Sequence, residues 1–146
     1  MNHVVFASIC AWALAQIIKT VIALVKNHRF DIGILIGPGG MPSSHSAIVC
    51  ALAASVFIVD GFSSTTFAVA FVLAVVVMYD AAGLRRSVGN QAAVLNRIVR
   101  EMKEHRPLAD FGHDLRELLG HTNLEVIAGA LLGIAIASLW FLFIVW

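Results

Sequence analysis

The chain has 146 residues, of which 60% are hydrophobic and 13% are charged, and its formal net charge is +1. A soluble domain typically carries about 25% charged residues, so this composition excludes an ordinary soluble globular protein and is typical of an integral membrane protein. The length fits one domain over residues 1–146. The net charge indicates no particular partner, and we expect no nucleic acid.

Four apolar runs predict membrane helices, over residues 4–25, 44–59, 66–82 and 126–146. The first has about the 20 residues that a spanning helix needs, whereas the second is short for a full span. The N-terminus lacks the basic start and cleavage site of a signal peptide, so we expect the first run to be retained. In the last run Gly129, Gly133 and Ala137 form a stripe of small residues for helix packing. The sequence therefore predicts an all-α membrane bundle.

The residues between the third and fourth runs have a different pattern. Over 91–105 the apolar residues, among them Val94, Leu95 and Ile98, recur at helical spacing, and charged residues such as Arg97 and Arg100 occupy the other face. This pattern predicts an amphipathic helix that lies at the membrane interface or against a partner. A further short helical turn is expected over 114–119.

The distribution of Lys and Arg predicts which connections share a membrane face. The connection 26–44 contains two of these residues and the segment 83–124 contains seven, whereas the N-terminal tail and the connection 60–65 contain none. The positive-inside rule then puts both termini and Ser63 outside, and both basic segments in the cytoplasm. This arrangement brings the starts of the second and fourth apolar runs to one face.

The second apolar run begins with a turn that could bind an anion. Residues 39–46 read Gly-Gly-Met-Pro-Ser-Ser-His-Ser, in which glycine allows close backbone approach, proline fixes the turn, and Ser43 or Ser44 is a natural N-cap. A helix N-terminus presents free N–H groups to a phosphate, and His45 could add proton transfer. The alternative interpretation is a capped helix start in which the histidine has no role.

The fourth apolar run also begins with a histidine. Residues 120–125 read Gly-His-Thr-Asn-Leu-Glu, in which Thr122 and Glu125 have the spacing of a capping box. Lys19 lies near the end of the first run, where a lone lysine usually extends to the headgroups; its alternative is to face the bundle interior. Two helix N-termini, two histidines and nearby basic residues predict a phosphate site, and we see no metal-ligand spacing.

The stretches 39–47, 80–91 and 120–129 together resemble the divergent branch of the PAP2 superfamily. That superfamily includes type 2 phosphatidic acid phosphatases, bacterial acid phosphatases and vanadium haloperoxidases. The resemblance covers nearly the whole chain. It implies a PAP2-like fold and a phosphatase that uses no metal or other cofactor. Such an enzyme hydrolyses a phosphomonoester or pyrophosphate, here of a lipid, through a phosphohistidine intermediate.

The resemblance also implies roles for individual residues. His121 matches the family's nucleophile, Glu125 stands where the family usually has an aspartate that orients it, and His45 matches the acid that protonates the leaving group. The usual Pro-Ser-Gly-His reads Pro-Ser-Ser-His here, with Ser44 in place of the glycine. The residues expected to hold the phosphate are Gly40, Ser43, Ser44, Arg29 with Lys19 or Lys26, and Arg85 or Arg86, with Arg116 as their rival.

We expect the protein in the bacterial cytoplasmic membrane, with its site on the cytoplasmic face. Its expected partners are membrane lipids and the phosphate-ester substrate, and homo-oligomerisation is left open. Two other functions stay open. One is a catalytically inactive PAP2-like protein that binds anionic lipid or phosphate. The other is a structural membrane protein whose amphipathic helix docks a partner.

Overall fold

The structure is a computed structural model that describes residues 2–27, 40–84, 91–100 and 122–145. These residues form helices and turns, without a strand among them. The four long helices are α1 (His3–Asn27), α3 (Ser44–Asp60), α4 (Thr65–Tyr79) and α6 (Asn123–Trp140). Two of them end in wider π-helical turns, namely α4 in η1 (Asp80–Leu84) and α6 in η2 (Phe141–Val145). The predicted all-α fold is confirmed.

Polar residues at the ends of the apolar runs set the helix boundaries. The Ser43 hydroxyl accepts a hydrogen bond from the Ser46 N–H at 3.4 Å, which makes Ser43 the N-cap of α3. The Ser64 hydroxyl accepts one from the Phe67 N–H at 3.1 Å and caps α4 in the same way. α3 ends at Gly61, whose φ of 81° lies in the left-handed region that favours glycine.

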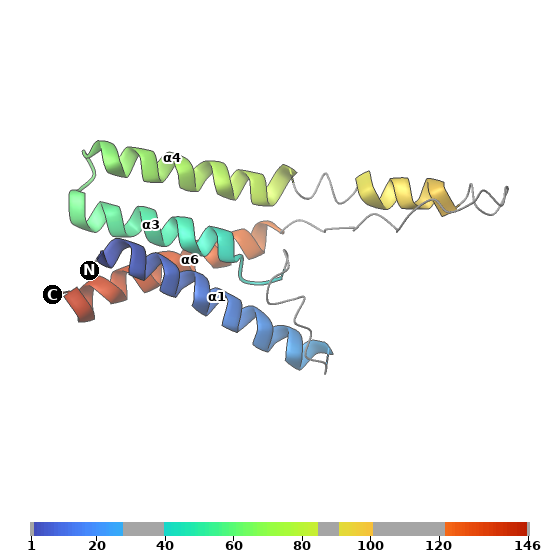
Figure 1. Cartoon of the computed structure of the whole chain (residues 1–146), viewed down its shortest axis with the longest axis horizontal. Helices are drawn as coiled ribbons and strands as arrows, with labels where there is room; N and C mark the ends of the chain where they lie inside the picture. The colour runs from blue at the N-terminus through green and yellow to red at the C-terminus, as the bar shows by residue number, and fades with distance from the viewer. Residues whose placement is uncertain (1, 28–39, 85–90, 101–121, 146) are drawn as a thin grey trace.

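Helix α3 lies at the centre of the bundle (Figure 1). It packs against α1, α4 and α6, and α1 and α6 also pack against each other. Helix α4 lies on the outside, with α3 as its one substantial neighbour among the long helices described. A helix at the centre of such an arrangement can place its first turn against several others.

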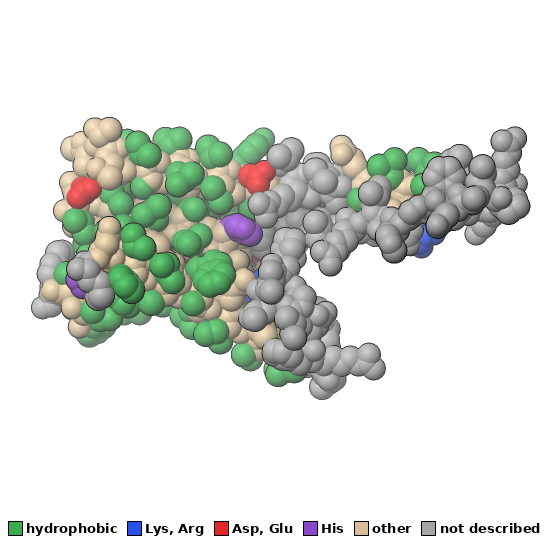
Figure 2. Space-filling model, in the orientation of Figure 1, with side chains coloured by type: hydrophobic (Ala, Val, Ile, Leu, Met, Phe, Trp, Pro, Cys, Tyr) green, Lys and Arg blue, Asp and Glu red, His purple; other side chains and the backbone are tan. Residues whose placement is uncertain are grey.

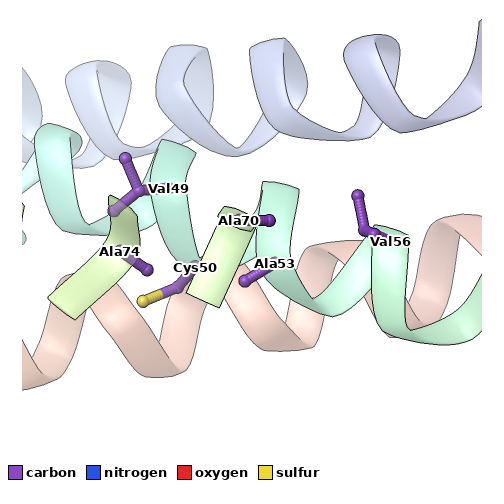
Figure 3. Close-up of a cluster of buried hydrophobic side chains, with 6 residues drawn as sticks. All are labelled: Val49, Cys50, Ala53, Val56, Ala70 and Ala74. Atoms are coloured by element: carbon purple, nitrogen blue, oxygen red, sulfur yellow. The ribbon is translucent and has the colours of Figure 1, made fainter. Parts of the chain in front are cut away.

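Helices α3 and α4 pack through side chains. Figure 3 shows the cluster between them, which contains Val49, Cys50, Ala53, Val56, Ala70 and Ala74. The sulfur atoms of Cys50 and Met78 lie 3.6 Å apart in the same region. Cys50 therefore serves as a small core residue.

Helices α3 and α6 approach each other much more closely. A Cβ atom at Gly133 would overlap the carbonyl oxygen of Ala47 and touch the backbone of Ala51. Ala51 also packs with Ala11 of α1 and Ala137 of α6, and all three alanines are fully buried. The stripe of small residues predicted on the last run therefore does form a helix interface, and it lets backbone meet backbone.

The helix ends divide into two groups along the bundle. Figure 1 places both chain termini and the turn between α3 and α4 at one end. The end of α1, the start of α3, the end of α4 and the start of α6 lie at the other. The predicted sidedness is thus confirmed for the described ends, while the choice of cytoplasmic side stays a prediction.

Among the described residues, three segments are long and apolar enough to cross a membrane: His3–Val25, Thr65–Gly83 and Asn123–Val145. With 17 residues, α3 is about 26 Å long, slightly shorter than a hydrocarbon core of about 30 Å. Figure 2 shows a largely hydrophobic bundle surface, with acidic side chains toward its ends. The protein is an integral membrane protein.

The expected amphipathic segment is helical over 91–100, and this helix lies beyond the end of the bundle (Figure 1). The expected turn over 114–119 falls outside the described residues.

Candidate functional site

The two helices that carry the predicted motifs begin side by side. The backbone N–H of Ser43 donates a hydrogen bond to the carbonyl oxygen of Glu125 at 2.9 Å. One turn further along α6, Gly129 has no side chain and lets the Ser43 carbonyl approach, because a Cβ there would overlap that oxygen. The N-cap of α3 is therefore joined directly to the first turn of α6, as the phosphate-site prediction requires.

The start of α3 is almost completely enclosed. Ser43 and Ser46 are fully buried, Ser44 is buried, and His45 is half-buried. The peptide bond between Met41 and Pro42, just before this start, is cis. The histidine thus sits in the first turn of a helix whose free N–H groups carry partial positive charge.

Lys19 faces the bundle interior, so its interpretation as a residue that extends to the headgroups is wrong. Only 3% of its surface is exposed. The reason lies in the spacing, because Lys19 follows Ala7, Ala11 and Ala15 at intervals of four and shares their helix face. Those three alanines are fully buried, so the same face carries the lysine inward.

Lys19 lies against the turn that precedes α3. A Cβ atom at Gly40 would stand 2.9 Å from Lys19 Cγ and 3.0 Å from Cδ. Gly40 also has a φ of 85°, which L side chains rarely adopt. The glycine in this motif therefore serves two needs: the left-handed turn and the space for the lysine stem.

The capping box at the start of α6 is confirmed. The Thr122 hydroxyl accepts from the Glu125 N–H at 3.4 Å, and Glu125 Oε2 accepts from the Thr122 N–H at 3.2 Å. A carboxylate has two oxygens and about four lone-pair sites, so it can accept more than one hydrogen bond. Capping α6 and orienting the neighbouring His121 are therefore compatible roles for Glu125.

The stretch 80–91, which also carries the family resemblance, starts at this end of the bundle as well. Asp80 is half-buried where α4 passes into η1, and η1 contacts α6. The expected site residues Arg29, Arg85, Arg86 and His121, and the rival Arg116, lie outside the described residues, as does the side chain of Lys26.

The structure brings the expected site residues together in two pairs. Lys19 lies against Gly40, and Ser43 is bonded to Glu125, with Ser44 and His45 next along α3. Within these same residues no three His, Cys, Asp or Glu side chains come together as a metal centre would need.

One buried group was missed from the sequence. Ser46 is fully buried beside Gly129, with its Cβ 3.0 Å from where a Cβ of that glycine would stand. In the described part of the chain its hydroxyl has no hydrogen-bond partner. The only signal in the sequence was its position three residues after the N-cap, on the face that α6 covers.

These features define a helical membrane protein with two capped helix starts, a buried lysine and a histidine at one end of the bundle. The chain matches the model of the divergent PAP2 family over residues 1–136. It is also 40% identical over 142 residues to the membrane protein YuiD of Bacillus subtilis (strain 168), covering 91% of this chain and 90% of that protein. No solved structure matches it. The chain belongs to the divergent PAP2 family.

Proposed function

We propose that this protein is a membrane phosphatase that hydrolyses a phosphomonoester or pyrophosphate of a lipid through a phosphohistidine. The observation that carries the proposal is the 2.9 Å hydrogen bond from the Ser43 N–H to the Glu125 carbonyl. It joins the two helix starts that bear His45 and Glu125, at an end of a membrane bundle where a lipid headgroup would lie. Membership in the divergent PAP2 family supports the same chemistry.

The reaction has two steps. In the first, the imidazole of His121 attacks phosphorus, a P–N bond forms, and the bond from phosphorus to the leaving oxygen breaks as His45 donates a proton to that oxygen. In the second, water attacks the phosphohistidine and gives a proton to His45. The P–N bond breaks, inorganic phosphate leaves, and both histidines return to their initial protonation states.

The surrounding groups stabilise the negative charge of the phosphoryl group. Lys19 supplies a cation beside Gly40, and the first N–H groups of α3 add partial positive charge. Their burial at this end of the bundle strengthens these interactions, because the local dielectric is lower than that of water. In this proposal the Glu125 carboxylate accepts a hydrogen bond from His121 and orients it, while it also caps α6.

The test separates the roles of the two histidines by the leaving group. His121→Ala should abolish phosphoenzyme formation with every substrate. His45→Ala should lose roughly 10²–10⁴-fold on an alkyl phosphate, whose alkoxide needs a proton to leave, and much less on a nitrophenyl phosphate. Rapid-quench measurement of phosphoenzyme formation gives these rates, and His3→Ala, at the opposite end of the bundle, is the matched control.

Three outcomes contradict the mechanism. Full activity in His121→Ala would remove the nucleophile, and equal losses on both substrates in His45→Ala would remove the general acid. A loss of activity with a chelator that a divalent cation restores would also contradict it, because no residue in the mechanism acts through a metal.

A second function, oxyanion or anionic-lipid binding without turnover, is favoured by one observation. Ser44 is buried where the family usually has a glycine, so its side chain occupies part of the space around the phosphate cradle. Tungstate or vanadate binding in the micromolar to millimolar range, roughly what several charged hydrogen bonds supply, would then occur without hydrolysis of any lipid phosphate. If Ser44→Gly gained turnover, this serine would be identified as the reason why the unchanged protein binds oxyanions without hydrolysing a lipid phosphate.

A further inference from the structure

We propose that the helix over 91–100 is an interfacial anchor that lies on the bilayer surface at the end of the bundle where the site is. Its apolar side chains are uncovered, with Val94 58%, Leu95 49% and Ile98 47% exposed. On the same helix Ala92 and Asn96 are buried. The helix therefore uses one face to pack within the chain and leaves a different, more apolar face open.

The two faces are nearly opposite. Ala92 and Asn96 are four residues apart and share one side of the helix, as do Val94 and Ile98. The second pair is displaced from the first by two residues, which is a rotation of about 200°. The apolar face consequently points away from the buried face of the helix, and another phase or molecule must cover it.

The bilayer lies within reach of this face. Helix α4 and its extension η1 include the membrane-crossing segment Thr65–Gly83, and η1 ends at Leu84. Six residues, 85–90, connect that end to the helix, and seven peptide steps span at most about 25 Å. The helix is thus tethered beside the headgroup region, where docking costs little translational freedom because the chain is already in the membrane.

Charge and tethering both favour lipid over a protein as the occupant. Arg97 and Arg100 are exposed on this helix, and two such cations suit anionic headgroups. In the bound state that we propose, the helix axis follows the bilayer surface rather than extending beyond the bundle as in Figure 1.

The experiment measures the depth of individual positions in vesicles of equimolar phosphatidylcholine and phosphatidylglycerol. The full chain, with Cys10→Ala and Cys50→Ala, carries a nitroxide label at Leu95→Cys or Ile98→Cys, and Ala93→Cys on another face is the matched control. The ratio of collisions with oxygen to collisions with a water-soluble nickel chelate should be several-fold higher at 95 and 98 than at 93. Leu95→Trp and Ala93→Trp, in a chain that keeps both cysteines and has Trp12, Trp140 and Trp146 replaced by phenylalanine, give the same comparison through quenching by brominated lipid if the first background does not fold.

Water accessibility at 95 and 98 equal to that at 93 would overturn the proposal. Protection of 95 and 98 from both collision partners, with magnetic coupling between labels on separate molecules, would overturn it in favour of a second copy of the chain. If the depth difference between positions 95 and 98 and position 93 is lost in vesicles of pure phosphatidylcholine, the result supports the role of the arginines in bilayer binding.

Discussion

Helix α3 makes two very different contacts on its two sides. Toward α6 it approaches so closely that Gly129 and Gly133 touch its backbone, and a hydrogen bond joins Ser43 to Glu125. Toward α4 it packs through side chains, and the outer face of α4 stays exposed, with Val69 64% and Tyr79 81% accessible. The contact between α3 and α6 depends on the positions of backbone atoms. The contact between α3 and α4 requires only apolar side chains of suitable volume.

This difference shows where the fold demands exact geometry. The α3–α6 side ends at the candidate site, so an error there would separate the two helix starts that the chemistry requires. The α4 side needs hydrophobicity and approximate shape, which many side chains supply. The following substitutions test that contrast, from the largest expected effect to the smallest.

Lys19→Met should have the largest effect on binding. Removing a charged hydrogen bond costs about 1.5–3 kcal/mol, which weakens tungstate binding by roughly 10- to 150-fold. The thermal midpoint is measured alongside, because the substitution also removes the contacts of a buried side chain. Isothermal titration and thermal unfolding in detergent measure the two quantities. Arg97→Gln, outside the bundle, is the control, and unchanged tungstate affinity in Lys19→Met would exclude the lysine from the site.

Gly129→Ala should destabilise the fold, because its Cβ would overlap the Ser43 carbonyl oxygen. Overpacking of this kind costs about 1–3 kcal/mol and should lower the midpoint of thermal unfolding. Gly83→Ala is the matched control, since a Cβ there meets nothing within 4 Å. Equal midpoints for the two variants would show that α3 and α6 are not in backbone contact.

Thr122→Ala and Glu125→Gln separate capping from catalysis. Loss of the cap hydroxyl should cost about 1 kcal/mol of unfolding free energy. Glutamine at the third helix position still completes a capping box. The unfolding free energy of Glu125→Gln should therefore stay close to that of the unchanged protein. Turnover should nevertheless fall in Glu125→Gln if the carboxylate orients His121. Full turnover in this variant would leave Glu125 with the cap alone.

Val72→Ala, on the exposed face of α4, should have the smallest effect. Its side chain is 59% exposed toward lipid, and substitutions at such positions usually stay within about 0.5 kcal/mol. Ala74→Leu, on the buried face of the same helix, is the comparison and should be clearly less stable. Similar thermal midpoints for both would mean that α4 is not seated on α3 as described.

The helices and their order could be predicted from the sequence because their signals are local. Long apolar runs end at capping residues, and Ser43 and Thr122 appear in the structure at the expected positions. The grouping of helix ends followed from counting spans and basic residues. The family resemblance rested on short stretches, and the family match confirmed it.

The burial of Lys19 could not be predicted, because it depends on which face of α1 meets α3 and α6. The three alanines before it, at intervals of four, hold the signal in retrospect, but such a stripe does not tell whether neighbouring helices also enclose the lysine that continues it. The bond between Ser43 and Glu125 has no local signal at all, since it joins segments that only tertiary packing brings together. Nor could the sequence tell that the partner of the Gly129 stripe is the backbone of α3.

The central position of α3 has a consequence for how the protein is made. Helix α3 is synthesised second among the four long helices, yet α6, its closest partner, is synthesised last. Helix α3 is short for a membrane and lined by small residues on the side that faces α6, so it packs against α1 and α4 but lacks its closest partner until α6 enters the bilayer. Biosynthesis thus delays assembly of the candidate site to its final stage, so that a nascent chain carries the first motif long before the start of α6 can lie beside it.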